Sequence, residues 1–529
     1  MESLGAQNRQ LDNLLVRLTR ADDAAAALDE PSAPRTLPAS PDGLEKLPPE
    51  TRASVLYRHL RDIRATGVGP RVRLERMASL GPLIADTANA LTAQSVTATD
   101  RRIAISMPIA LLKCRYDIKR QALVLSLRES HGDTALVTDS LLATFSGLFD
   151  LLTCYWLQHL PPPERLWGEL HALYLLSHQV GAGAGSPPTT AVLREVRNAY
   201  LKPLLLGTLN PSRFNVGEIR QLIGFVSDHV SHARLGGGHG LFSVDPRCDR
   251  PPIYAVRDRD RERSVSLCTK NLVGMLDTAR LTARLREDMR RYWSSEQIRS
   301  EYHQRTDERV ELVFGLEAAH QLFTGCVDDD DFLSHLGARD AGQRLIAQAP
   351  IELHSATCID RSPSGVRLQL TGAPESLGPG ELVALLHNGA PQCRLGIIRW
   401  TQLTPSLDSV AGIQWLPDPG RPCGTAAVTG KSATPYFRSF LVPGAAHGAW
   451  DLLAPSGILK VGGLLHLMDH AGEMDLSITA VADTTPQISR FHTAPADLGC
   501  VAATAPVIQA PAIRQAHAGH GSARTASAI

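Results

Sequence analysis

Apolar residues recur at every third or fourth position through most of the segment from residue 46 to residue 235. This spacing puts them on one side of a helix, so it predicts a series of amphipathic helices. Gly- and Pro-rich stretches separate these segments, and the expected structure is therefore an α-helical domain of stacked helical hairpins. The clearest helical patterns cover residues 53–63, 72–91, 141–160, 166–180, 192–206 and 216–233.

The pattern changes after the glycine-rich stretch at 235–240. Residues 236–300 mix short strand-like runs with helical ones, and the helical pattern continues from 271 to 308. Short apolar runs broken by Gly and Pro then predict strands within 301–424 and again within 425–496. Residues 1–45 and 497–529 are rich in Ala, Pro, Ser and Gly, and this composition predicts a disordered arm and a disordered tail. The fold class is therefore α+β multidomain.

One stretch, residues 141–158, is apolar enough to resemble a membrane span. Asp150 lies near its centre, where a charge costs about 3 kcal/mol on insertion scales. A buried core helix is the better interpretation. The N-terminus lacks the basic and then apolar pattern of a secretory signal, which favours a cytoplasmic protein.

Composition narrows the classes of partner. The 54 Lys and Arg residues equal the 54 Asp and Glu residues, so no net field recruits nucleic acid or an anionic membrane. The nine cysteines are scattered without a C-x-x-C pair, which favours a reducing cytoplasm over a disulfide framework or a zinc site. No motif of a catalytic nucleophile, zinc protease or paired carboxylates is visible, so we expect no enzyme, no metal and no cofactor.

Two short motifs carry the candidate chemistry. Arg305 and Arg309 form R-x-x-x-R directly before the apolar run 310–314, and Asp360, Ser362 and Gly365 form D-x-S-x-x-G directly before the run 366–370. Arginine offers a planar donor fork that matches phosphate oxygens and the O6/N7 edge of guanine. An Asp/Ser turn that ends in glycine lets a backbone approach a ligand closely.

Together and in this order, the motifs resemble the cyclic di-GMP binding signature of PilZ domains. Two further segments, 395–400 and 411–416, resemble the closing strands of the PilZ barrel. The resemblance covers about residues 300–420. It implies a PilZ-like antiparallel β-barrel with a helical insertion at 301–424, followed by an additional small β region. It also implies a cytoplasmic receptor that binds cyclic di-GMP through the five motif residues and acts on an unidentified protein partner.

The chain departs from the compact pattern in one respect. Arg309 and Asp360 are 51 positions apart, and the insertion between them holds a helix-like run, an acidic patch at 328–331 and a second helix-like run at 332–348. Arg339 and Arg344 are therefore an alternative arginine pair. A second hypothesis is a degenerate PilZ-like scaffold that binds no nucleotide and works through its helical domain.

Three structural expectations complete the sequence analysis. The charged segment before Val310 should be loose without ligand, because it holds one apolar anchor, Tyr302. The barrel core should draw on Ile397, Ile398, Trp400, Ile413 and Trp415, with at least one tryptophan largely buried. The G-K-S at 430–432 has the wrong glycine spacing for a phosphate-binding loop, and we interpret it as no such loop.

Overall fold

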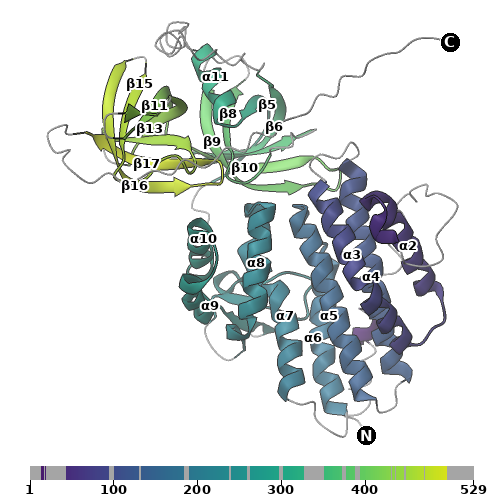
Figure 1. Ribbon diagram of the computed structural model, residues 1–529. Coiled ribbons are helices and arrows are strands. Elements are labelled where there is room, and N and C mark those ends of the chain that lie inside the picture. The colour runs from purple at the N-terminus through teal and green to yellow at the C-terminus, as the bar shows by residue number, and fades with distance from the viewer. Residues whose placement is uncertain are drawn as a thin grey trace, which may run out of the picture. The chain divides into compact units, whose positions relative to one another are not determined.

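The structure, a computed structural model of the 529-residue chain, combines a helical region with two antiparallel β-barrels (Figure 1). This confirms the α+β multidomain class. The chain divides into two compact units, residues 1–314 with 352–415 and residues 315–351 with 416–529. The residues that the structure describes are 13–16, 18, 43–94, 101–129, 133–183, 190–236, 240–258, 263–296, 302–326, 351–371, 377–387, 393–429, 432–434, 436–445, 448–469 and 471–496.

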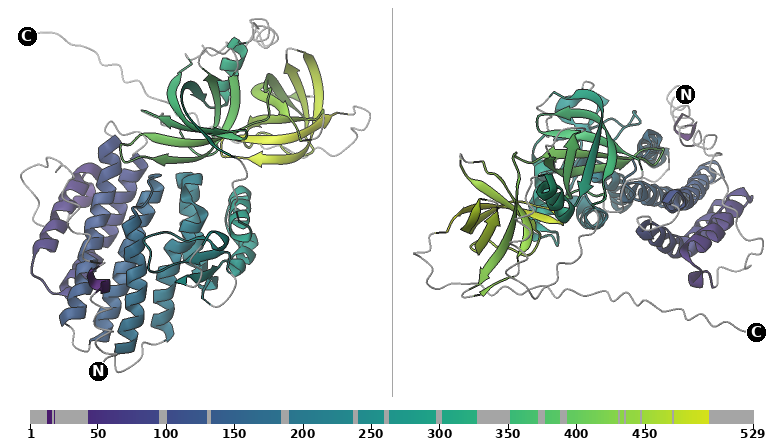
Figure 2. Two further views of the ribbon diagram at one scale, coloured as in Figure 1. Left: turned by 180° about the vertical axis from the view of Figure 1, so that it is seen from behind. Right: turned by 90° about the horizontal axis from the view of Figure 1, so that it is seen from above.

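The helical region contains long helices that stand side by side in Figures 1 and 2. Each of the six helical patterns of the sequence corresponds to a helix in the structure. A seventh long helix, α4, was not singled out by the sequence, and it packs against α2, α3 and α5. The helices are α2 (Pro49–Ala65), α3 (Pro70–Gln94), α4 (Arg101–Glu129), α5 (Thr134–Leu157), α6 (Glu164–Gly183), α7 (Thr190–Leu209) and α8 (Val216–His229).

Helix α4 has a blurred pattern because it buries charged side chains. Arg120 is 2 % exposed, lies 3.8 Å from the carboxylate of Glu169, and donates to the backbone carbonyl of Leu18. The Tyr116 hydroxyl donates to Glu169 at 2.5 Å. Buried charges need such partners. A pattern that assigns every charge to the surface therefore misses this helix.

Helix α5 is the apolar stretch that resembled a membrane span. It begins at Thr134, where the Asp133 side chain accepts a hydrogen bond from the Leu136 amide at 3.0 Å. By length and composition it is one helix of the described residues that could cross a membrane. In the structure its apolar residues belong to the core of the helical region, and Asp150 pairs with Arg115 at 3.0 Å. This packing agrees with a buried core helix.

Along the chain, a small mixed region of strands and helices connects the helical region to the first barrel. A four-stranded sheet in the order β1-β4-β2-β3 is followed by two short helices. The expectation of helix up to residue 308 is wrong, because the last of these helices ends at Ser294 and the chain is already a strand at Gln304. The elements are β1 (Arg234–Leu235), β2 (Phe242–Val244), β3 (Ile253–Tyr254), β4 (Val265–Cys268), α9 (Lys270–Met275) and α10 (Ala283–Ser294).

Six strands close the first barrel in the order β10-β7-β6-β5-β8-β9. Ile397, Ile398 and Ile413 are buried as expected. Trp400 and Trp415 are of intermediate exposure, and Trp415 packs against this core, so neither tryptophan is fully buried or fully exposed. The strands are β5 (Gln304–Phe314), β6 (His354–Ser362), β7 (Gly365–Leu370), β8 (Leu382–His387), β9 (Cys393–Leu403) and β10 (Ser409–Trp415).

The expected additional β region is a second closed barrel, because β11 pairs with both β13 and β15. It begins at Arg421, so the first barrel ends at Trp415 and not at residue 424. Gly424, the first glycine of the segment that ends in G-K-S, lies inside strand β11, so it does not belong to a phosphate-binding loop. The strands, yellow-green in Figure 2, are β11 (Arg421–Thr429), β12 (Ser432–Ala433), β13 (Phe437–Pro443), β14 (Trp450–Pro455), β15 (Leu464–Asp469), β16 (Gly472–Thr484) and β17 (Ile488–Pro495).

The two barrels have the same strand order. Numbered along the chain within each barrel, and with the short β12 left out, the strands run 1-2-3-6-5-4 and close back on the first in both. The insertion in the first barrel begins with α11 (Leu316–Cys326), which packs on β13 and β11 of the second. Phe323 contacts Phe440 there, with ring centroids 5.2 Å apart. The acidic patch, the run at 332–348, Arg339 and Arg344 lie outside the described residues.

Candidate functional site

The two motif arginines lie on strand β5, on the outer surface of the first barrel. Arg305 is paired with Asp360 of β6, and Arg309 with Thr357. Arg309 precedes Val310, a residue of the barrel core, so its side chain points outward. Arg367 lies between Val366 and Leu368, whose side chains are in the core, so the Arg367 side chain points outward. Asp360 is paired with both Arg367 and Arg305, and paired residues share a face, so all three side chains point outward. The fold therefore brings the two motifs together on one face.

The expectation of a loose segment before Val310 is wrong for residues 304–309, which form part of strand β5. A one-residue irregularity falls between Arg305 and Glu308 in the pairing with β6. Such a bulge re-aims side chains at the edge of a functional site. Arg305 and Arg309 are both exposed, and within the described ranges neither guanidinium has an ion-pair or hydrogen-bond partner.

The second motif forms a tight hairpin between β6 and β7. Pro363 and Ser364 make the two-residue turn, and the Ser362 hydroxyl donates to the Gly365 carbonyl at 3.4 Å. A Cβ on Gly365 would lie 2.4 Å from the Ile413 carbonyl oxygen of β10. Glycine is therefore required at 365, because β10 passes so closely. The Asp/Ser turn that the sequence predicts at 360–365 is present.

Asp360 is engaged by two neighbouring basic side chains. Its carboxylate accepts from Arg367 at 2.8 Å and from His303 Nδ1 at 3.1 Å, and its side chain is 14 % exposed. Next to it, Arg361 lies 3.5 Å from the Glu308 carboxylate. A carboxylate has about four acceptor positions on its two oxygens. Asp360 can therefore hold Arg367 and still accept from a ligand.

A cavity of about 540 Å³ adjoins these residues at the end of the barrel where β5 begins and β6 ends, here called the mouth. Sequence reasoning missed the Tyr302 and Arg394 side chains as parts of the site. Arg394 lies on β9, far from both motifs in the sequence. Closure of the barrel brings it to the cavity, and no motif in the sequence indicates this position. The lining residues are Tyr302, Gln304, Arg361, Ser362, Pro363 and Arg394.

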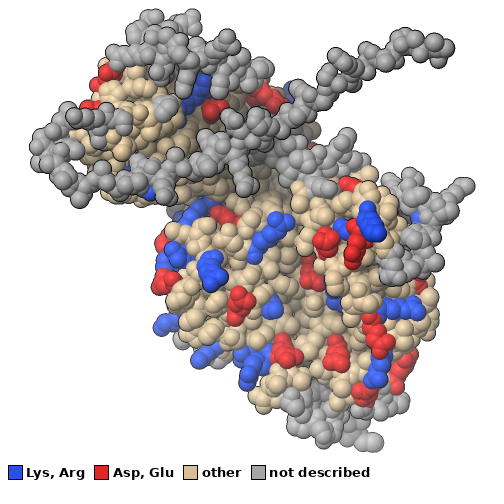
Figure 3. Space-filling view, viewed as in Figure 1, with Lys and Arg blue, Asp and Glu red and all other residues tan. Residues whose placement is uncertain are grey.

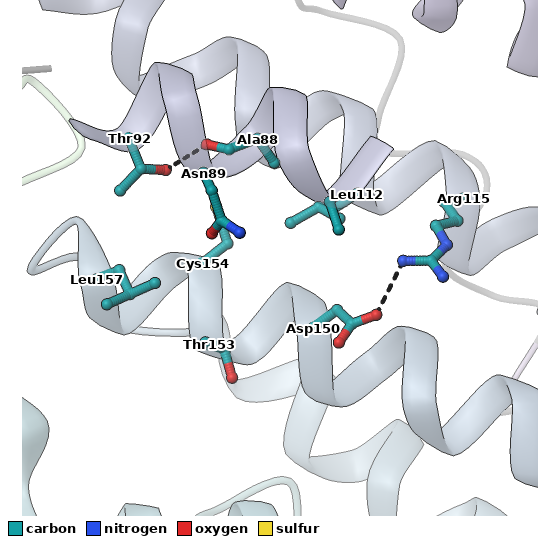
Figure 4. A pocket seen from close by; sticks show the side chains of 10 residues that line it. Ala88, Asn89, Thr92, Leu112, Arg115, Asp150, Thr153, Cys154 and Leu157 are labelled. Carbon is teal, nitrogen blue, oxygen red and sulfur yellow. Dashed lines mark hydrogen bonds and ion pairs between the residues drawn. The ribbon is translucent and has the colours of Figure 1, made fainter. Parts of the chain in front are cut away.

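A second cavity, of about 120 Å³, lies in the helical region among α3, α4 and α5 (Figure 4). The Arg115–Asp150 ion pair stands at one end of it. Burial raises the pKa of Asp150 and lowers the pKa of the nearby Lys119 to about 8. The space suits a few water molecules beside a buried ion pair and is far too small for a dinucleotide.

Surface charge and metal-ligating side chains are the other features that could mark a site. On the face shown in Figure 3, basic and acidic side chains of the helical region are interspersed without a patch of one sign. Within the residues that can be described, no group of three or more His, Cys, Asp or Glu side chains is arranged to hold a metal ion.

Comparison with known proteins adds an independent line of evidence. Residues 41–239 match the family model of the N-terminal domain of the cyclic-di-GMP receptor FimW. The chain is 22 % identical over 366 residues to the cyclic-di-GMP receptor FimW of Pseudomonas aeruginosa, in an alignment that covers 54 % of this chain and 60 % of that protein. The chain thus spans about three-fifths of the length of that curated relative. The family-model match falls on the helical region, whereas the candidate ligand residues lie beyond it, from 302 to 394.

Proposed function

We propose that this protein is a receptor for cyclic di-GMP and that the ligand binds to the first barrel. The observation that carries the proposal is the placement of Arg305 and Arg309 on one face with Asp360 and beside the mouth cavity, exposed and without a partner among the described residues. The similarity of the helical region to a domain of a cyclic-di-GMP receptor supports the same function from a different part of the chain.

The chemistry of the ligand fits this arrangement. Cyclic di-GMP carries two phosphates and two guanines. Arg305 and Arg309 donate to phosphate oxygens, where a charge-assisted bidentate pair is strong. Asp360 accepts from guanine N–H groups with the acceptor positions that Arg367 and His303 leave open. Ser362 and Gly365 hold the hairpin against β10, so that Asp360 keeps its position.

In this proposal the first barrel is a PilZ domain, and its strand closure and motif positions support that assignment. The protein is a cytoplasmic, non-enzymatic effector that needs no cofactor, and its helical region contacts a protein partner rather than nucleic acid or membrane. Within the first unit, the Leu403 amide of β9 donates to the His159 carbonyl just after α5, at 2.9 Å. A ligand that shifts β9 therefore acts on the helical region through a direct hydrogen bond.

The alternative is a scaffold whose barrel has lost the nucleotide. The ion pair between Asp360 and Arg367 favours it, because a carboxylate already paired with a neighbouring strand of its own barrel needs no ligand. Calorimetric titration of the purified full chain with cyclic di-GMP separates the two. The receptor gives saturable heat with cyclic di-GMP and none with GTP at the same concentrations. Absence of heat and of thermal stabilisation at millimolar cyclic di-GMP refutes the receptor proposal.

A further inference from the structure

We propose that Arg394 is a third ligand arginine, which reads the O6/N7 edge of a guanine stacked on Tyr302 in the mouth of the first barrel. This inference rests on the proposed function and deepens it, because it assigns the residue that selects guanine over adenine. Neither residue belongs to the two sequence motifs.

The geometry of Arg394 suits this task. Its guanidinium lies 4.5 Å from the centre of the Trp415 ring. An arginine that covers an aromatic ring with one face keeps its N–H edge available for a ligand. Arg394 pairs with Leu385, whose side chain lies in the barrel core, so Arg394 is on the inward face and lines the mouth cavity. Among the described residues no carboxylate pairs with it.

Tyr302 supplies the second half of a purine site. It is 85 % exposed, the highest value among the large hydrophobic side chains of the described residues, and it lines the same cavity. An exposed aromatic ring beside a cavity is a stacking platform for a base. The cavity therefore offers a flat apolar surface for the guanine face and a planar donor fork for its edge.

The second barrel provides an internal comparison. Arg421 lies 4.0 Å from the centre of the Trp450 ring, at the end of the second barrel where its first strand begins. There, however, the buried Asp469 carboxylate lies 3.3 Å from the Arg421 guanidinium. Among the described residues the Nε–H of each arginine is buried without an acceptor, so the difference between the two is the carboxylate. The second barrel neutralises its own arginine, whereas the first leaves Arg394 for a ligand.

The test compares matched substitutions, Arg394→Lys and Arg421→Lys, which both keep the positive charge and lose the planar fork. Affinities for cyclic di-GMP and cyclic di-AMP are measured by calorimetry on the full chain, and circular dichroism checks the fold. Because a bidentate arginine–guanine pair gives strong discrimination, we expect Arg394→Lys to weaken cyclic di-GMP binding about tenfold or more and to reduce the preference over cyclic di-AMP equally. Arg421→Lys should keep both values.

Each outcome has a distinct meaning. Unchanged affinity and unchanged preference in Arg394→Lys overturn the assignment of Arg394 while the receptor proposal stands. Absence of binding by the wild-type protein overturns the receptor proposal itself. Tyr302→Ala is the second variant: it should weaken binding of both dinucleotides to a similar extent, because stacking does not distinguish purines. Wild-type affinity in Tyr302→Ala overturns the stacking platform.

Discussion

Replacement of Gly365 by alanine should loosen the first barrel at the hairpin that presents Asp360. The new Cβ would lie 2.4 Å from the Ile413 carbonyl oxygen, whereas ordinary contact begins at 3.4 Å. The two strands β7 and β10 must therefore separate by about 1 Å. The neighbouring hydrogen bond from the Trp415 amide to the Ser364 carbonyl, 2.9 Å long, lies directly in the path of that shift.

The magnitude follows from two contributions. Overpacking of a well-packed site costs about 1–3 kcal/mol, and the loss of one backbone hydrogen bond costs about 1 kcal/mol. The free energy of opening this part of the barrel should thus fall by about 2–4 kcal/mol, which is roughly 30-fold to 1,000-fold in an opening equilibrium.

Native-state amide hydrogen exchange measures this locally, which matters because a multidomain chain has no single free energy of unfolding. Peptides that cover β7 and β10 should exchange faster by that factor, and peptides from the helical region should not change. Gly67→Ala is the control, since nothing lies within 4 Å of its new Cβ. Unchanged exchange in β7 and β10 of Gly365→Ala would refute the explanation of this glycine as a packing requirement.

Two further predictions concern buried titratable groups: Glu381, directly before β8 of the first barrel, and His320 of α11, which packs on the second. Burial raises the pKa of Glu381 to about 7; the native state keeps a proton that the unfolded state loses near pH 4.5, so stability falls as pH rises through 7. Glu381→Gln should gain up to about 3 kcal/mol relative to wild type between pH 5 and pH 8, in the opening free energy that amide hydrogen exchange gives for β8. An equal difference from wild type at both pH values would contradict this. Burial, with a smaller contribution from Arg438, lowers the pKa of His320 to about 4. Its stabilisation is complete above pH 6.5 and is lost as pH falls through 4, by up to about 3 kcal/mol. His320→Gln should remove this loss from the opening free energy that amide hydrogen exchange gives for α11 and β13 between pH 7 and pH 4; an identical acid dependence would show that His320 is not its source.

The elements that could be predicted from the sequence are those in which the apolar residues are buried and the charged residues are exposed. Helices α2, α3, α5, α6, α7 and α8 bury apolar faces, so their period is visible. Helix α4 hides its period because Tyr116, Asp117 and Arg120 form a buried polar network. The helical pattern up to residue 308 failed for a related reason. Strand β5 begins with charged residues on the outer face of a barrel, where composition resembles an exposed helix.

The candidate site shows the same limit. Arg305, Arg309, Asp360, Ser362 and Gly365 could be named because they lie in two short motifs. Tyr302 and Arg394 could not, because only the closure of six strands brings the start of β9 to the same cavity as the start of β5 and the end of β6. The second barrel was likewise hidden, since its closure depends on the pairing of β11 with β15.

The most direct test of the receptor proposal is a calorimetric titration of the full chain and of its Arg305→Ala/Arg309→Ala variant with cyclic di-GMP. Each charge-assisted contact contributes about 1.5–3 kcal/mol, so the double variant should bind about 100-fold more weakly or worse. Arg290→Ala, which removes an arginine of α10 paired with Asp277 in the small mixed region, is the control and should bind like wild type. Wild-type affinity in the folded double variant would contradict the placement of the ligand on the first barrel.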